Sequence, residues 1–217
     1  MKIAIVCSDQ THPVYQHLET WCRRYSAVHD INIATKLDKL PAAEILFLVS
    51  CSEIVRDQHR AKFGHIMVLH ASDLPEGKGW SPYVWDILAG KEQLTLSLID
   101  AADPVDSGAI WAKKTFHVDK NLLWDEINEL LFTAELSLMN EAIELVKAGA
   151  SCVPQETSGE TWHRKRTQKD SELDPAKSIA EQFDLLRICD PNRYPAHLEF
   201  RGSRYKITIE RMPDDPS

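Results

Sequence analysis

A histidine and a group of carboxylates lie at the ends of two apolar runs of the chain. His70 closes the run HIMVLH, and Asp100, Asp103 and Asp106 follow the run LTLSLI. An imidazole and a carboxylate together can move protons near neutral pH. This combination suits the attack of an amine on a carbonyl group, in which the amine loses a proton and the leaving group gains one. The alternative interpretation is structural, because strand-end histidines and turn aspartates often bind backbone groups.

Strands and helices alternate along the sequence around these residues. Apolar runs predict strands at 2–7, 31–34, 43–49, 65–70, 94–99 and 109–118, the last paired antiparallel, and helical patterns cover 13–25, 53–62, 82–90 and 122–148. This alternation predicts an α/β fold, with a Rossmann-like, mostly parallel sheet and helices on both faces. Ligands of such sheets bind beyond the carboxyl ends of the strands. We therefore expect residues 50–52, 70–82 and 101–108 to meet in one crevice.

The character of the chain changes near residue 150. Residues 1–150 are predicted to form the main domain, and the polar, proline-bearing residues 151–175 a linker or long loop, a length that is uncommon without function. Residues 176–212 are predicted to form a small C-terminal subdomain with a helix at 178–190 and strands at 196–200 and 205–210. The last residues, MPDDPS, are expected to form a frayed tail.

Composition narrows the classes of function. The 217 residues carry a formal net charge of -8, which argues against broad binding to nucleic acids. No apolar run is long enough to cross a membrane, and the start MKIAIVCSDQ does not resemble a signal peptide. Five cysteines without a CxxC pair indicate reduced thiols in a cytoplasmic protein. No histidine spacing predicts a metal site, and no GxGxxG follows the first strand to predict a dinucleotide site.

Two segments carry a resemblance to a known family. LHASDLPEGKGWSP resembles the H-x-S-L-L-P-x-x-x-G loop of the formyltransferases that use N10-formyltetrahydrofolate, and DPVDSGAIW resembles their D-x-G-x-I segment. The resemblance covers residues 44–111 well and continues loosely through RKRTQKDSELD and LLRICDPNRYPAHLEFRG. The GWSP variant is most similar to the sugar N-formyltransferase branch, and within it to enzymes of pseudaminic-acid-type amino sugars. The resemblance implies that residues 1–150 are a formyltransferase catalytic domain.

The resemblance also implies roles for individual residues. His70 would polarise the formyl oxygen or protonate the departing folate nitrogen, and Asp106 would accept the amine proton, directly or through water, and orient His70. N10-formyltetrahydrofolate would be the co-substrate, with no metal required. The residues expected to hold it are Cys51, Ser52, Ile54 and Val55, together with backbone groups of Ala101, Ala102 and Asp103.

A nucleotide-linked amino sugar is the acceptor that the resemblance implies. Its expected contacts are Ser72, Lys78, Gly79 and Trp80. Lys78 stands where the family usually has arginine, and a flat indole such as Trp80 suits a sugar or a base. Lys78, Arg164 and Arg166 offer charge to a nucleotide diphosphate, although both arginines can also be ordinary surface charge. No nucleic acid or membrane partner is expected, and the C-terminal strands are candidates for pairing in a homodimer.

One departure from the family pattern leaves other functions open. The family usually has asparagine two residues before the histidine, and this position is Val68 here. Valine has no hydrogen-bond donor for the oxyanion, and the loss of one such donor typically costs about 3 kcal/mol of transition-state stabilisation. Val68 therefore motivates one alternative, a catalytically inactive relative that binds folate or a nucleotide. The resemblance leaves two others open, a methionyl-tRNA formyltransferase-like enzyme and a formyl-tetrahydrofolate hydrolase.

Overall fold

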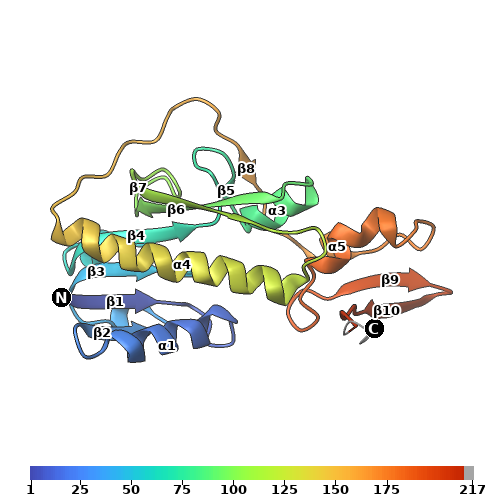
Figure 1. Cartoon of the computed structure of the whole chain (residues 1–217), viewed down its shortest axis with the longest axis horizontal. Helices are drawn as coiled ribbons and strands as arrows, with labels where there is room; N and C mark the ends of the chain where they lie inside the picture. Colours follow the sequence, from blue (N-terminus) through green and yellow to red (C-terminus); the bar gives the residue numbers. More distant parts are fainter. Residues whose placement is uncertain (213–217) are drawn as a thin grey trace, which may run out of the picture.

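A six-stranded sheet of order β2-β1-β3-β4-β6-β7 forms the centre of the protein (Figure 1). The computed structural model describes residues 1–212 of the chain. The strands are β1 (Lys2–Val6), β2 (Asp30–Ala34), β3 (Ala43–Leu48), β4 (Phe63–His70), β6 (Gln93–Asp100) and β7 (Ile110–His117). The first four are parallel, whereas β6 is antiparallel to β4 and β7 to β6. The predicted α/β fold with a mostly parallel sheet is confirmed.

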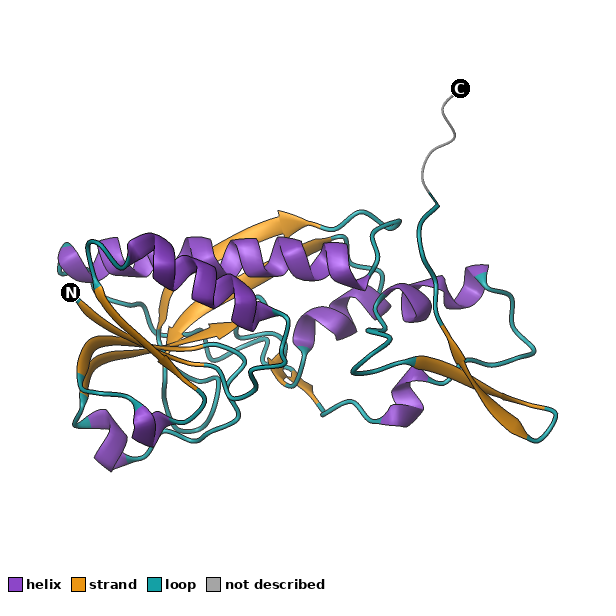
Figure 2. Cartoon of the chain, turned by 90° about the horizontal axis from the view of Figure 1, so that it is seen from below, coloured by secondary structure: helices purple, strands orange, loops and turns teal. Residues whose placement is uncertain are grey.

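Helices cover both faces of the sheet (Figure 2). α1 (Val14–Tyr25) and α4 (Trp124–Lys147) lie on one face, and η1 (Leu37–Lys39) and α2 (Asp57–Arg60) lie on the other. α3 (Pro82–Leu88) follows the loop after β4. Alternate residues of β1 enter separate clusters, since Ile3 and Ile5 join the α1/α4 core while Ala4 and Val6 join the opposite one. Burial on both faces explains the continuous apolar run of this strand.

Helix α4 is the long helix that the sequence predicted over 122–148. Its buried face follows helical spacing, and the residues on it are Ile127, Leu131, Phe132, Ala134, Glu135, Leu138, Met139, Ala142 and Ile143. A single carboxylate, Glu135, is therefore part of an otherwise apolar face. Within residues 1–212, no helix combines the length and apolarity needed to cross a membrane.

Two predicted helices are shorter in the structure. The helix expected at 53–62 is reduced to α2, because the carboxylate of Glu53 accepts a 2.5 Å hydrogen bond from the amide of Leu37 and Val55 packs into the core of that face. The helix expected at 178–190 is divided into η3 (Ala180–Gln182) and α5 (Phe183–Arg187). Gln182 bonds main-chain atoms of the preceding turn, which competes with regular helix.

The direction of β6 corrects the expected crevice. Because β6 is antiparallel to β4, its carboxyl end lies opposite the middle of β4, with Asp100 paired to Met67. Residues 101–108 therefore do not leave the sheet beside residues 50–52 and 70–82, as a parallel strand would require. They start near Ile66, whose carbonyl accepts the amide of Ala101, and fold back until Asp106 reaches His70.

Residues 151–166, here called the crossing segment, return from the end of α4 across the sheet (Figure 1). Val153 forms an antiparallel bridge with Ile110, and β8 (Trp162–His163) pairs in parallel with β5 (Lys78–Gly79). The chain continues through η2 (Gln168–Ser171) to α5. A separate hairpin of β9 (Ala196–Phe200) and β10 (Ser203–Ile207) lies at the far end of the molecule. Of the predicted tail at 212–217, residues 213–217 lie outside the described residues.

Candidate active site

The side chains of His70 and Asp106 contact each other, although the two residues are 36 positions apart in the chain. The Nδ1 atom of His70 is 3.5 Å from Oδ1 of Asp106, and its Nε2 atom donates to the carbonyl oxygen of Gly77 at 3.0 Å. Both ring nitrogens of His70 therefore face oxygen atoms that can accept a hydrogen bond. The two side chains are only 8% and 7% exposed, so the pair lies beneath the surface loops and not on an open rim.

The backbone around Asp106 is bent sharply to deliver this carboxylate. Asp106 has a φ of 61°, in the left-handed region that most side chains avoid. Its Oδ2 atom accepts the amide of Gly79 at 2.9 Å, which ties the aspartate loop to the histidine loop. Gly108 passes so close to the carbonyl oxygen of Asp100 that an added Cβ would lie 1.7 Å from it. The close approach requires glycine at this position.

The crossing segment holds both loops. Gln155 donates to the carbonyl oxygens of Asp106 and Gly108, each at 2.8 Å. Thr161 accepts the amide of Gly77 through its hydroxyl at 2.8 Å and the amide of Lys78 through its carbonyl at 2.9 Å. The sequence interpretation assigned no role to Gln155 or Thr161. The available signal was the unusual length of the polar loop that contains them.

Val68 lies on the same face of β4 as His70, because alternate residues of a strand share a face. Its side chain is half-buried and packs against the cluster that includes Leu46, Leu48 and Ile66. No donor side chain replaces the usual asparagine at this position of the strand. Any donor for an oxyanion must therefore come from a neighbouring loop or from His70 itself.

Three of the residues expected to bind N10-formyltetrahydrofolate, Cys51, Val55 and Ala101, pack together with Val68 against one core cluster. Ile54, next to Val55 in the chain, is 67% exposed. An apolar wall of this kind fits the flat ring of a folate. The Ala101 amide and carbonyl already bind Ile66 and Arg60, so the backbone groups left for a ligand here belong to other members of the segment, Ala102 and Asp103 among those expected.

The expected acceptor-binding residues differ in accessibility. Ser72 is 1% exposed and lies inside the histidine loop, where its hydroxyl has no partner among residues 1–212. Lys78 is also buried and forms a 3.0 Å ion pair with Glu160 of the crossing segment. Trp80 is 49% exposed and carries the Lys165 ammonium 4.5 Å from its ring centroid. Trp80 is thus the member of this set that offers an open surface, while Gly79 contributes its amide to Asp106.

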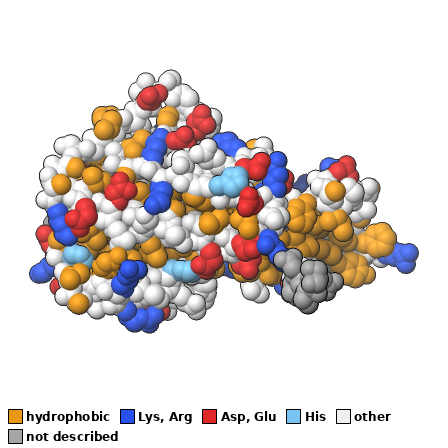
Figure 3. Space-filling view, in the orientation of Figure 1, with side chains coloured by type: hydrophobic (Ala, Val, Ile, Leu, Met, Phe, Trp, Pro, Cys, Tyr) orange, Lys and Arg blue, Asp and Glu red, His pale blue; other side chains and the backbone are white. Residues whose placement is uncertain are grey.

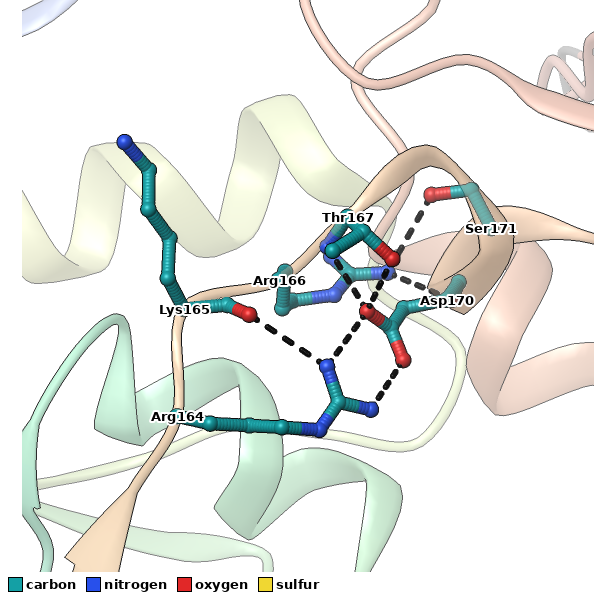
Figure 4. A network of polar contacts seen from close by, with 6 residues as sticks. All are labelled: Arg164, Lys165, Arg166, Thr167, Asp170 and Ser171. Carbon is teal, nitrogen blue, oxygen red and sulfur yellow. Dashed lines mark hydrogen bonds and ion pairs between the residues drawn. The ribbon is translucent and has the colours of Figure 1, made fainter.

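The two arginines of the crossing segment have different environments (Figure 4). Arg164 makes a bidentate ion pair with Asp170, with one contact at 2.7 Å, and this pairing holds the pKa of the aspartate well below its usual range. Arg166 is half-buried and donates to the carbonyl of Asp170 and the hydroxyl of Ser171. Within residues 1–212, no cluster of three or more histidine, cysteine, aspartate or glutamate side chains is arranged to bind a metal ion.

The protein is thus an α/β protein with a buried histidine–aspartate pair at the end of strand β4, two groups of the kind that act in acid–base chemistry. Residues 1–143 match the family model described as formyl transferase. The chain belongs to this family, whose members carry out folate-dependent formyl transfer. Membership confirms the family that the sequence motifs at 70–82 and 103–111 resembled.

The chain is similar to methionyl-tRNA formyltransferases in sequence and in fold. Methionyl-tRNA formyltransferase of Clostridium beijerinckii is 27% identical over 201 residues, which cover 90% of this chain and 61% of that protein. The chain thus spans less than two thirds of the length of this relative. Among solved structures, methionyl-tRNA formyltransferase from Clostridium thermocellum has a TM-score of 0.79 at 22% identity, with 99% of this chain and 94% of that chain covered.

Two further solved structures represent other branches. HypX from Aquifex aeolicus, solved in complex with tetrahydrofolic acid, has a TM-score of 0.80 at 17% identity and covers 96% of this chain and 37% of its own. A sugar N-formyltransferase from a Shewanella species has a TM-score of 0.73 at 14% identity, with 99% of both chains covered. At these identities the structures show a shared fold, and they leave the acceptor open.

Proposed function

We propose that this protein transfers a formyl group from N10-formyltetrahydrofolate to the amine of a nucleotide-linked amino sugar. The observation that carries the proposal is the contact of the His70 imidazole with the Asp106 carboxylate inside a formyl transferase domain. The resemblance of the histidine loop to the sugar branch supports the acceptor class. The exposed face of Trp80 next to the Lys165 ammonium suits a base or sugar with a nearby phosphate.

The proposal gives complementary tasks to His70 and Asp106. Asp106 accepts the proton that the attacking amine loses, directly or through a water molecule. The His70 imidazolium donates a hydrogen bond to the formyl oxygen or a proton to the departing folate nitrogen. The carbonyl of Gly77 and the carboxylate of Asp106 fix the orientation of the ring between these events. The apolar wall of Val55, Val68 and Ala101 would receive the folate ring of the donor.

The acceptor distinguishes this proposal from that of a methionyl-tRNA formyltransferase. Transfer RNA binding depends on basic surface, and this chain has a formal net charge of -8. Two cations near the site are already paired within the protein: Arg164 with Asp170, and Lys78 with Glu160 of the crossing segment. An amino sugar attached to a nucleotide needs only a small cationic and aromatic surface.

The test is a donor assay with a panel of acceptors. The protein is incubated with N10-formyltetrahydrofolate, and tetrahydrofolate release is followed alone, with nucleotide-linked amino sugars and with methionyl-tRNA. Release that depends on an amino sugar supports the proposal, and release that depends on methionyl-tRNA replaces it. Tetrahydrofolate release without any acceptor identifies a hydrolase. Binding of N10-formyltetrahydrofolate without release identifies an inactive relative, the outcome expected if the missing hydrogen-bond donor at Val68 abolishes catalysis.

The C-terminal hairpin is a candidate contact between two copies of the chain. Hydrophobic side chains gather over β9 and β10 in the space-filling view (Figure 3). Phe200 and Tyr205 of the hairpin, and Tyr194 just before it, are each between 46% and 49% exposed. A two-stranded hairpin is marginally stable alone, and a second copy would cover these side chains. Sedimentation of the wild type and of Phe200→Ser tests this: a dimer that dissociates in the variant supports it, and a wild-type monomer excludes it.

A cytoplasmic location is part of the same proposal. All five cysteines are free in the structure, and Cys7 and Cys189 are buried. Free thiols are typical of a reducing compartment such as the cytoplasm. Fractionation of the native host, with the protein followed by antibody, tests this directly.

A further inference from the structure

Two exposed tryptophans lie on the short ribbon that β5 and β8 form (Figure 1). Trp162 of β8 is 55% exposed, and Trp80, which directly follows β5, is 49% exposed. Lys78 pairs with Trp162 in the parallel register, and the amide of Trp80 donates to the carbonyl oxygen of His163 at 3.1 Å. The two indoles are therefore carried by neighbouring positions of one hydrogen-bonded ribbon. Exposed apolar groups that gather in one place are typical of a surface that binds a ligand.

Each of the two indoles lies against an ammonium group. Nζ of Lys78 is 5.6 Å from the ring centroid of Trp162, and Nζ of Lys165 is 4.5 Å from that of Trp80. Lys78 shares a face with its register partner Trp162, and also with Trp80, because alternate residues of a strand share a face. We call the surface of Lys78, Trp80, Trp162 and Lys165 the ribbon face. It combines two flat aromatic rings with two cations.

The two ammonium groups of the ribbon face differ in their availability to a ligand. Lys78 is buried and forms a 3.0 Å ion pair with Glu160, which also accepts a hydrogen bond from the indole nitrogen of Trp162. Lys165 is exposed, and within the described residues 1–212 its ammonium has no carboxylate partner. Figure 4 shows the Lys165 side chain extending away from the network around Asp170, which both neighbouring arginines join. Lys165 is thus the cation of the ribbon face that is free to meet an anion.

Strand β5 connects the ribbon face to the His70–Asp106 pair. The carbonyl of Gly77 accepts a hydrogen bond from His70, and the amide of Gly79 donates to Asp106. The amides of the alternate positions, 78 and 80, donate instead to the crossing segment. Adjacent strands lie about 5 Å apart, so β8 is one strand spacing farther from the pair than β5 is. A ligand with its reacting end at the pair can therefore extend over β5 and reach β8.

We propose that Trp80, Trp162 and Lys165 bind the nucleoside diphosphate end of the acceptor, with the base stacked on the indole of Trp162 and a phosphate paired with the ammonium of Lys165. This inference rests on the proposed function, because it adds a nucleotide site to the acceptor of that reaction. Any base can stack on an aromatic side chain, and a lysine ammonium has three donors for phosphate oxygens. Trp80, which follows the strand nearer to the reacting pair, contacts the part of the ligand between these two ends.

Charge complementarity favours an anionic occupant. Residues 164–166 are three consecutive cations in a chain whose formal net charge is -8. The carboxylates that face this run, Glu160 and Asp170, are already in ion pairs with other cations. A diphosphate neutralises the charge that Lys165 leaves unpaired, whereas an uncharged sugar does not.

The experiment compares nucleoside diphosphates with their parts. Uridine, deoxythymidine, guanosine and cytidine diphosphates are titrated calorimetrically against the full chain. The tightest of them is then compared with its nucleoside, which lacks the phosphates, and with inorganic pyrophosphate, which lacks the base. We expect the diphosphate to bind about 10-fold or more tightly than either part. Absence of binding by all four diphosphates, or an affinity no higher than that of pyrophosphate, would overturn the inference.

Variants separate the two ends of the site. Trp162→Leu is expected to remove the advantage of the diphosphate over pyrophosphate, and Lys165→Gln to weaken both while the affinity for the nucleoside stays. Lys165→Arg should restore the affinity for pyrophosphate. Tyr205→Leu and Lys169→Gln, at exposed positions outside the ribbon face, should behave as the wild type. Thermal unfolding checks the fold of each variant.

An unchanged base advantage in Trp162→Leu, or an unchanged affinity for pyrophosphate in Lys165→Gln, contradicts the proposed site. Self-association of the wild type that Trp162→Leu abolishes would assign the indoles to a contact between copies of the chain and would also reject the site.

The proposed function and this inference fail in different ways. A nucleoside diphosphate that binds through Trp162 and Lys165 to a protein that releases no tetrahydrofolate supports the binding site and rejects the transfer reaction. Formyl transfer to a nucleotide-linked amino sugar with a KM unchanged in both Trp162→Leu and Lys165→Gln supports the reaction and rejects the binding site.

Discussion

Gln155 and Asp106 are joined by a 2.8 Å hydrogen bond from the glutamine amide to the aspartate carbonyl. The same amide nitrogen donates to the carbonyl of Gly108 at 2.8 Å, so one side chain spans the bend that carries the proposed catalytic carboxylate. The backbone of Asp106 has a positive φ of 61° in this bend, which costs conformational energy for a residue with a side chain. Gln155 of the crossing segment therefore stabilises the backbone around Asp106, although its own side chain takes no part in the proposed reaction.

We expect Gln155→Leu to lower kcat about 30-fold while the KM for either substrate changes little. The variant loses two neutral hydrogen bonds of about 1 kcal/mol each, which hold the backbone of Asp106 in place. A loss of about 2 kcal/mol in the transition state corresponds to about 30-fold in rate. Steady-state kinetics and the pH profile of kcat measure the effect, because a displaced carboxylate also alters the acid limb. Glu156→Ala, at the exposed neighbouring position, is the control. An unchanged kcat and pH profile would show that Gln155 has no positioning role.

His70→Ala and Asp106→Ala are each expected to abolish turnover and to leave the fold intact. General acid–base groups typically contribute 10²- to 10⁴-fold, and the isosteric variants His70→Gln and Asp106→Asn should lose about as much. Tetrahydrofolate release measures the rate, and circular dichroism with thermal unfolding checks the fold. A rate near that of the wild type in any of the four well-folded variants would remove the assigned role of that residue.

Val68→Asn should raise kcat and lower the thermal stability. The amide would add the donor that the strand lacks beside His70, and a single oxyanion donor contributes on the order of 100-fold or more in other enzymes. Its insertion into the apolar cluster of Leu48 and Ile66 costs stability, because the new polar group loses water. Val68→Leu is the matched apolar control and should change the rate little. A kcat of Val68→Asn below that of the wild type would indicate that the oxyanion does not lie next to position 68.

Gly79→Ala is expected to separate the crossing segment from the histidine loop. An added Cβ would lie 2.3 Å from the carbonyl oxygen of His163, where the parallel pairing of β5 and β8 leaves no space. Gly149→Ala has a similar positive φ but meets no atom within 4 Å, so it reports backbone strain alone. The difference between the two variants in thermal midpoint and in kcat measures the clash. Equal effects of both would attribute the loss to strain.

Acid should weaken the attachment of the crossing segment through Asp170. The bidentate pairing with Arg164 holds the pKa of Asp170 well below the value near 3.9 of an unfolded chain. A lowered folded-state pKa stabilises the protein above the unfolded value and loses this effect as the pH falls toward the folded value. Asp170→Asn should therefore lower the thermal midpoint at pH 7, and its difference from the wild type should shrink below about pH 4. Glu141→Gln should show no such pH-dependent difference.

The contact between His70 and Asp106, the proposed catalytic pair, is the part of the site that the sequence alone predicted best. The apolar run before His70 and the turn residues around Asp106 were enough to propose proton chemistry, and the contact between them follows the motif. The sequence did not predict the direction of strand β6, which leads the chain toward this contact. The run at 94–99 has the apolar character of a buried strand in either direction, so its antiparallel pairing with β4 depends on contacts distant in sequence.

Other features depend on side-chain contacts that no local pattern reveals. Gln155 and Thr161 act on loops far from them in the chain, and their segment has only the polar composition of a linker. Glu135 occupies a position of α4 where the helical spacing predicts a buried apolar residue. From the sequence it could equally be a surface carboxylate next to an apolar face. The structure shows that it is buried and that its Oε2 atom has no hydrogen-bond partner among residues 1–212. The assignment of residues 151–175 as a linker stays a prediction.

We expect activity to require an intact backbone in the crossing segment, because this segment joins the loops of His70 and Asp106. Residues 156–160 are exposed between two anchored points, Gln155 on one side and Thr161 on the other. A single proteolytic cut there would leave His70, Asp106 and every donor contact in the protein, yet it would free the two anchors from each other. Inactivation by nicking would then occur without loss of any residue that touches a substrate.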